Sequence, residues 1–140
     1  MVLLVPLSAL AQSGAAPAAP PETLLGDFVD DYGILYSVQV SEFLQGSQAR
    51  YHIVEWDAVG QFLVARNDAG NPAEGGLWTR IDWTILDGAD GFEWAFCYAV
   101  YDADSAAAAK RAAATERDTP RSGCNGFPFS RMKRVGPKAF

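Results

Sequence analysis

The chain has 140 residues, of which 49% are hydrophobic and 12% aromatic, and its net charge is −6 at pH 7. A chain of this length fits one domain and can bury roughly two-thirds of its unfolded surface. With this composition, we expect disorder only at the two ends of the chain. The charge is uneven, with 15 acidic and 3 basic residues over 22–104 against 2 acidic and 8 basic residues over 105–140. So acidic a body argues against nucleic-acid binding.

The N-terminal segment 1–11, MVLLVPLSALA, is apolar and ends in small residues at the spacing of a signal-peptidase site. Residues 12–22 are rich in Ala and Pro, which is typical of a flexible linker. We therefore predict a signal peptide truncated at its start, a linker, and a secreted or periplasmic protein; a buried N-terminal strand is the alternative for 1–11. No other apolar run approaches the ~18 residues of a membrane span, so we expect no crossing of the membrane.

Cys97 and Cys124 are the only two cysteines of the chain. In an exported protein a single pair of cysteines indicates a disulfide. Closing a loop of this length stabilises the folded state by about 3.5 kcal/mol in the chain-entropy account. A catalytic thiol is the less favoured alternative.

The middle of the chain alternates apolar and polar residues, as half-buried strands do. The pattern predicts strands over 34–43, 50–57, 61–67, 76–86 and 91–101, with a sixth strand at GDFVDDYG. The breaks between them are rich in Gly, Asp and Asn, which are turn residues. Short turns make sequence neighbours antiparallel neighbours in space, so we predict a mainly β fold with an antiparallel meander of six to eight strands.

A turn at DGADG would pair the two strands that flank it. If Asp87 to Asp90 form the turn, Trp83 lies opposite Trp94 and Ile81 lies opposite Phe96. The face that carries these side chains is then almost wholly apolar and aromatic. A slip by one residue would mix the two faces, so the pattern specifies which side faces the core.

The reverse face of the same hairpin carries Arg80 and Asp82, two residues apart. We predict that they form a structural charge pair, with Trp78 as a surface on which Arg80 stacks. A ligand site at this pair is the less favoured alternative.

An Ala-rich segment, DADSAAAAKRAAATER, predicts a helix near 104–117, with Asp102 or Asp104 as its N-cap. Small side chains let this helix pack against the outside of the sheet, close enough to the last long strand for Cys124 to reach Cys97. We expect a single barrel-like domain over 23–131 and a basic tail over 132–140.

The strands at 50–57 and 61–67 are apolar on both faces. The simplest register places Tyr51, Ile53 and Glu55 on one face with Phe62 and Val64. Two apolar faces indicate either that something covers the outside or that the sheet curls around a cavity.

The meander begins with Gly26-Asp27-Phe28, and it is followed by a helix outside the last long strand and a nearby disulfide. This arrangement resembles a lipocalin-type barrel of smaller size. The runs GLWTRIDWT, FCYAVYDA and GCNGFPFS resemble a group of small exported bacterial proteins that is uncharacterised. This second likeness covers residues 26–131. The first implies a small lipocalin-like barrel, closed or incomplete; the second carries no catalytic residues.

Catalytic and metal-binding patterns are weak in this sequence. His52 is the only histidine, and we expect a structural role for it rather than a catalytic one. We expect no metal, since a zinc site lacks ligands and no stretch has the spacing of a calcium loop. No glycine-rich phosphate loop follows a strand, and nothing selects one carboxylate pair for glycoside hydrolysis. We therefore expect no cofactor and no enzymatic activity.

The leading hypothesis is a secreted or periplasmic binding protein that holds a small apolar ligand in an aromatic-lined barrel. The candidate ligand contacts are Trp83, Trp94, Phe96, Tyr98, Ile53 and Phe62. The alternative is an envelope protein-interaction or inhibitor-like module with a packed core, which would present the loop NDAGNPAEGG and the tail SRMKRVGPKAF to a protein partner.

Overall fold

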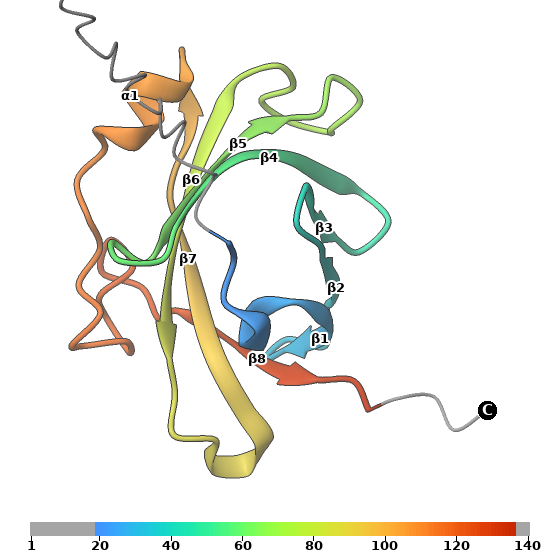
Figure 1. The fold of residues 1–140 in the computed structure, drawn as a ribbon, viewed down its shortest axis with the longest axis vertical. Helices are drawn as coiled ribbons and strands as arrows, with labels where there is room; N and C mark the ends of the chain where they lie inside the picture. Colours follow the sequence, from blue (N-terminus) through green and yellow to red (C-terminus); the bar gives the residue numbers. More distant parts are fainter. Residues whose placement is uncertain (1–18, 137–140) are drawn as a thin grey trace, which may run out of the picture.

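The computed structural model describes residues 19–136, so the predicted signal peptide, most of the linker and the end of the tail lie outside the described residues. Eight antiparallel strands form a closed barrel, in which each strand pairs with the next in sequence and the last pairs with the first (Figure 1). This confirms the predicted mainly β antiparallel barrel with an outer helix. The strands are β1 (Gly26–Asp30), β2 (Leu35–Val38), β3 (Glu42–Gln45), β4 (Ala49–Asp57), β5 (Phe62–Asn67), β6 (Trp78–Ile85), β7 (Phe92–Ala103) and β8 (Ser130–Arg134).

Three short helices complete the fold. Two 3₁₀ turns, η1 (Glu22–Leu24) and η2 (Ala89–Gly91), precede β1 and β7, and the single α-helix of the described chain is α1 (Ala106–Lys110). Within residues 19–136, no helix combines the length and the apolar character that a membrane crossing requires.

The predicted basic tail at 132–140 is wrong for its first residues, because they belong to the barrel. Met132 lies in β8, opposite Asp30 of β1 on one side and Trp94 of β7 on the other. Its side chain is fully buried, and β8 is the strand that closes the barrel. The domain therefore extends to Arg134, beyond the predicted end at 131.

The β6–β7 hairpin has the predicted faces but a register shifted by two residues. Trp83 lies opposite Phe96, and Ile85 lies opposite Trp94. The turn is longer than predicted because η2 includes Asp90 with a positive φ of 56°. Side chains alternate with a period of two, so a two-residue shift leaves the side chains from Ile81 to Ile85 on their predicted faces. The pairing shifts again at Arg80, and Val100 packs outside the barrel.

The interior of the barrel is filled by side chains. One cluster of buried residues runs through it: Leu24, Phe28, Tyr36, Val38, Phe43, Trp56, Leu63, Ala65, Ile81, Trp83, Trp94, Phe96 and Met132. Its rings make mostly edge-to-face contacts, for example 5.3 Å between the centroids of Phe28 and Trp94. Such contacts stabilise the core beyond the burial of apolar area.

A β-bulge in β4 decides which side chains enter this cluster. The pairing with β5 shifts between Ile53 and Glu55, so that Ile53 pairs with Ala65 but Glu55 pairs with Val64. Side chains after the bulge therefore change faces. Ile53 packs against the interior, whereas Phe62 packs outside with Val64, and the predicted common face of Ile53 and Phe62 is wrong.

The α-helix lies outside the barrel over β5, β6 and β7, as Figure 1 shows, but it is shorter than the predicted span of 104–117. Its N-cap is Ser105, whose Oγ accepts a hydrogen bond from the Ala108 amide at 3.0 Å, and neither Asp102 nor Asp104 takes that place. The helix ends at Lys110, whose carbonyl accepts a hydrogen bond from the Arg80 side chain at 2.8 Å.

The predicted disulfide between Cys97 and Cys124 is confirmed, with a Cα–Cα distance of 5.6 Å. It attaches the loop after α1 to the outer face of β7, where Ala95, Cys97 and Phe129 form a small buried cluster.

Candidate functional site

Three of the predicted ligand contacts are packed core. Trp83, Trp94 and Phe96 are each at most 2% exposed. Trp94 lies 6.1 Å from Phe96 between ring centroids, and Trp83 lies 5.7 Å from the ring of Trp56. The structure brings these side chains together as predicted. They pack against one another and are part of the hydrophobic core.

Tyr98 and Ile53 lie nearer one end of the barrel and are only partly buried. The Tyr98 hydroxyl donates a hydrogen bond to Gln45 Oε1 at 2.6 Å, and its ring lies 5.6 Å from that of Tyr51. These two tyrosines therefore form the transition between the aromatic core and the end of the barrel.

A pocket of about 670 Å³ lies at this end, which we call the barrel mouth. Three connections surround it: the β1–β2 turn, the β3–β4 turn and the loop between β5 and β6. The pocket is lined by Gly33, Ile34, Leu35, Gln45, Gly46, Ser47, Gln48, Ala49, Tyr51, Asn71, Pro72 and Ala73. Its lining combines apolar side chains with amide and hydroxyl groups.

Asp30 organises the β1–β2 turn at the mouth. It is 6% exposed, and its Oδ1 accepts hydrogen bonds from the amides of Tyr32 at 2.8 Å and Ile34 at 2.9 Å. Its Oδ2 accepts a hydrogen bond from the Tyr36 hydroxyl at 2.8 Å. A buried carboxylate that accepts three hydrogen bonds fixes the turn and places Ile34 beside the pocket.

The loop on the opposite side of the mouth is also fixed by side chains. Asn67, which is buried, donates hydrogen bonds to the carbonyls of Glu74 at 2.9 Å and Tyr101 at 2.8 Å. Asn71 exchanges two hydrogen bonds of 2.9 Å with the backbone of Arg50. The rim of the mouth is therefore formed before any ligand arrives, which reduces the entropy cost of binding.

Burial raises the pKa of the three tyrosines near the mouth. For Tyr36 the pKa lies far above its ordinary value, first because of burial and then because of the hydrogen bond to Asp30. Burial is also the main cause of the raised pKa of Tyr51 and Tyr98. All three hydroxyls therefore stay protonated at neutral pH and can donate hydrogen bonds.

The predicted charge pair is confirmed on the outer face of β6. Arg80 Nε lies 2.7 Å from Asp82 Oδ1, under α1 and the loop that follows it. Asp82 Oδ2 also accepts hydrogen bonds from the amide and the hydroxyl of Thr115, each at 2.8 Å. The pair holds the loop to the barrel and has its hydrogen bonds satisfied, which indicates a structural role.

The predicted stacking partner of Arg80 is wrong. The Arg80 guanidinium lies 4.1 Å from the ring centroid of Phe62, whereas Trp78 lies under Arg66 at 5.6 Å. Arg117 was not predicted as a structural residue, but it donates hydrogen bonds to the carbonyls of Trp83 at 2.8 Å and Gln61 at 2.7 Å. Its position in an irregular loop gave no periodic signal.

His52 lies on the outside of β4 with carboxylates on both sides. Its Nε2 lies 2.8 Å from Asp68 Oδ1, and its Nδ1 lies 3.9 Å from Glu42 Oε1. The hydrogen bond with His52, together with one from the Gly70 amide, lowers the pKa of Asp68. Within residues 19–136, no group of three or more His, Cys, Asp and Glu side chains is placed to hold a metal ion.

Comparison of the chain with known protein families, with curated proteins and with solved structures finds no significant match. The resemblances to lipocalin-type barrels and to small exported bacterial proteins therefore remain expectations from the sequence.

Proposed function

We propose that this is a non-enzymatic binding protein that takes a small, mainly apolar ligand at the barrel mouth. The supporting observation is the pocket of about 670 Å³ that three preformed connections surround at the end of the aromatic core. Pockets for small molecules typically measure about 300–1,000 Å³. The proposed ligand site is the open end of the barrel and not its centre, because Trp83, Trp94 and Phe96 fill the centre.

The lining favours a ligand with an apolar body and one or two polar groups. Ile34, Leu35 and Pro72 supply apolar contacts, and Tyr51 supplies a ring against which the ligand packs. Gln45 presents a carboxamide whose Oε1 already accepts a hydrogen bond from Tyr98 at 2.6 Å. A few fixed polar groups among apolar walls orient a ligand and provide specificity.

We place this function in the periplasm or outside the cell. The disulfide between Cys97 and Cys124 supports this location, because such bonds persist in oxidising compartments. The apolar start of the sequence, MVLLVPLSALA, supports it as well.

The test is an NMR titration of ¹⁵N-labelled protein with dodecanoic acid, farnesol and an uncharged naphthalene dye. We expect saturable shifts at the amides of Ile34, Gln45 and Ala49 with at least one of these probes. The variant Tyr51→Ala should bind about tenfold more weakly, the cost of one buried aromatic contact. The control is Tyr101→Ala, an exposed tyrosine outside the pocket. No saturable shift at the mouth with any probe would contradict the proposal.

The alternative function is an envelope protein-interaction or inhibitor-like module. One observation favours it: the loop predicted as a contact is both exposed at Pro72, Ala73 and Glu74 and held rigidly by Asn67 and Asn71. The predicted contribution of the tail is reduced, since its first residues form β8. Pull-down from envelope extract with wild-type protein and with Glu74→Asn separates the two functions, because Glu74 is exposed on this loop but does not line the barrel mouth.

A further inference from the structure

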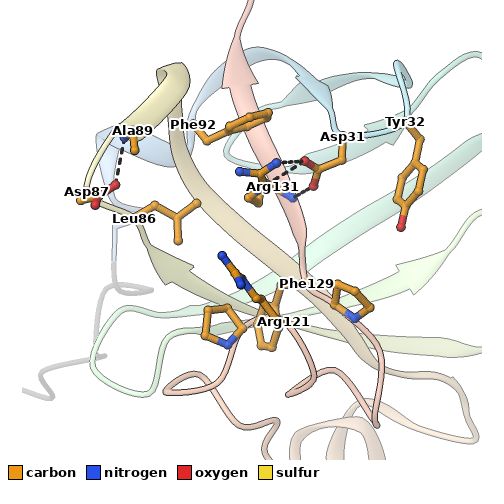
Figure 2. A pocket seen from close by; sticks show the side chains of 11 residues that line it. Asp31, Tyr32, Leu86, Asp87, Ala89, Phe92, Arg121, Phe129 and Arg131 are labelled. Atoms are coloured by element: carbon orange, nitrogen blue, oxygen red, sulfur yellow. Dashed lines mark hydrogen bonds and ion pairs between the residues drawn. The ribbon is translucent and has the colours of Figure 1, made fainter.

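A second pocket, of about 480 Å³, lies on the outside of the barrel. Figure 2 shows that it forms where the β6–β7 turn, the loop around Arg121 and the strand β8 approach one another. Its lining residues are all different from those of the barrel mouth. We call it the lateral pocket.

The floor of the lateral pocket is apolar and anchored. Phe129 is 3% exposed and packs in the cluster that contains the disulfide-bonded Cys97. Leu86 packs against the same cluster, and its side chain lines the pocket. The Phe129 amide donates a hydrogen bond to the carbonyl of Pro120 at 2.7 Å, which fixes the loop next to Arg121. The floor is therefore a preformed surface for an apolar group.

One wall of the lateral pocket is a neutralised arginine. Arg131 donates hydrogen bonds from Nε to Asp31 Oδ1 and from its backbone amide to Asp31 Oδ2, each at 2.8 Å. Its guanidinium lies 4.0 Å from the ring centroid of Phe92. The charges of Arg131 and Asp31 thus compensate each other, and both oxygens of Asp31 are occupied.

Arg121 and Asp87 are the charged lining residues that remain. In the part of the chain that the structure describes, 19–136, no carboxylate lies within ion-pair distance of the Arg121 guanidinium, and Figure 2 shows the side chain extending from the loop into the pocket without an interaction with the other lining residues. Asp87, the other acid of the lining, accepts a hydrogen bond from the Ala89 amide at 2.9 Å. The lateral pocket therefore presents the guanidinium of Arg121 without an ion-pair partner above an apolar floor, with the Asp87 carboxylate elsewhere in the lining.

We propose that the lateral pocket binds a small organic acid with an aromatic or aliphatic body. The carboxylate pairs with the Arg121 guanidinium, whose planar array of N–H donors fits two carboxylate oxygens. The body packs on Phe129 and Leu86. An inorganic anion would leave this floor uncovered, so the pocket favours an acid that carries a hydrophobic group.

The test compares 3-phenylpropionate with the uncharged 3-phenylpropanamide in NMR titrations of the full chain at pH 7 and low salt. We expect saturable shifts at the amides of Leu86, Arg121 and Phe129 with the acid, and binding about five- to tenfold weaker with the amide, since a charged hydrogen bond is lost. Equal affinities for the two probes, or no saturable shift with the acid, would overturn the proposal.

Two exposed arginines provide matched variants. Arg121→Gln should lower the affinity for the acid to that for the amide, whereas Arg111→Gln, at the end of α1, should leave it unchanged. Unaltered binding by Arg121→Gln would also overturn the proposal. Tyr51→Ala alters the barrel mouth alone, so unchanged binding of the acid by this variant separates the lateral pocket from the proposed mouth site.

Discussion

Asp82 and Thr115 connect the outer face of β6 to the irregular loop that follows α1. The carboxylate of Asp82 accepts hydrogen bonds from the amide and the hydroxyl of Thr115, each at 2.8 Å, while its other oxygen lies 2.7 Å from Arg80 Nε. The side chain of Asp82 is wholly buried. One carboxylate therefore holds a cation, a loop and, through Arg80, the end of the helix in place.

Removing this charge should destabilise the fold. In Asp82→Asn, the buried Arg80 loses its counterion, and breaking a buried pair in this way costs about 3–5 kcal/mol. We expect a clear fall in the midpoint of urea unfolding, measured by Trp fluorescence. Asp90→Asn is the control, because Asp90 is exposed and Asn accepts its positive φ. An equal midpoint for Asp82→Asn and wild type would show that the pair contributes nothing.

Reduction of the disulfide should also destabilise the fold. The bond between Cys97 and Cys124 closes a separation of 27 residues, for which the chain-entropy account gives about 3.5 kcal/mol. Urea unfolding of the Cys97→Ser/Cys124→Ser double variant, and of wild type with and without reductant, measures this loss. Wild type should become sensitive to reductant, whereas the double variant should not. Free thiols detected by mass spectrometry in the oxidised folded protein would contradict the bond.

Stability should fall at alkaline pH because of the buried tyrosines. Burial raises the pKa of Tyr36, Tyr51 and Tyr98 in the folded state, so the unfolded chain releases these protons first, near its ordinary pKa of about 10. The stabilisation of the folded state by these three tyrosines is fully present below a pH of about 10 and is lost as the pH rises above it.

The variant Tyr98→Phe isolates one of these groups. At pH 8 it should be less stable than wild type by about 1 kcal/mol, because the hydrogen bond to Gln45 is lost. At about pH 10.8 the difference should shrink, since Phe has no proton to release. Urea unfolding at both pH values provides the measurement, and Tyr101→Phe, at an exposed site, should keep the wild-type stability at pH 8. A stability difference between wild type and Tyr98→Phe that grows with pH would contradict the prediction that the folded state keeps Tyr98 protonated.

Two buried tryptophans should differ in their tolerance of Phe. Trp56 Nε1 donates a hydrogen bond to the Val40 carbonyl at 2.7 Å, whereas Trp94 Nε1 is buried without a hydrogen-bond partner among the described residues. Trp56→Phe loses a hydrogen bond and leaves an acceptor behind, so it should cost about 1 kcal/mol more than Trp94→Phe. Thermal or urea unfolding of the two variants tests this. A greater loss for Trp94→Phe would indicate that its indole N–H has an important partner.

Much of the fold follows from local patterns in the sequence. The alternation around Trp83 predicted the inner and outer faces of β6, and two cysteines in a chain expected to be exported predicted their bond. The two-residue register error came from the turn, because Asp90 with its positive φ extends the connection by a 3₁₀ turn that the letters DGADG do not specify. A turn of different length with the same parity preserves the faces, so this error left the predicted core intact.

Tertiary contacts account for the other errors. Alanines continue after Lys110, and helix propensity alone would extend α1 through them. The helix ends because the Arg80 side chain donates hydrogen bonds to the carbonyls of Lys110 and Ala112, and because the Thr115 amide donates one to Asp82. Arg80 and Lys110 are 30 residues apart in sequence, so propensity does not reveal their contact.

The candidate site was the part least accessible from sequence. Phe62 fits the aromatic pattern of a barrel wall, but it faces outward against Arg80, and the bulge after Ile53 puts Ile53 on the opposite, inner face. Gln45 was not predicted as a site residue, although it borders the barrel mouth beside Tyr51. A mouth is assembled from turns that are distant in sequence, and only the closure of the barrel shows that these turns meet.

Native mass spectrometry of the protein, purified without detergent from the cells that naturally produce it, tests the proposed binding at the barrel mouth most directly. We predict a bound small molecule in the wild-type protein that is released by organic solvent and strongly reduced in Tyr51→Ala, but retained in Tyr101→Ala. A wild-type protein with the bare polypeptide mass, unchanged after incubation with a lipid extract of the same cells, would contradict a small-molecule site at the mouth.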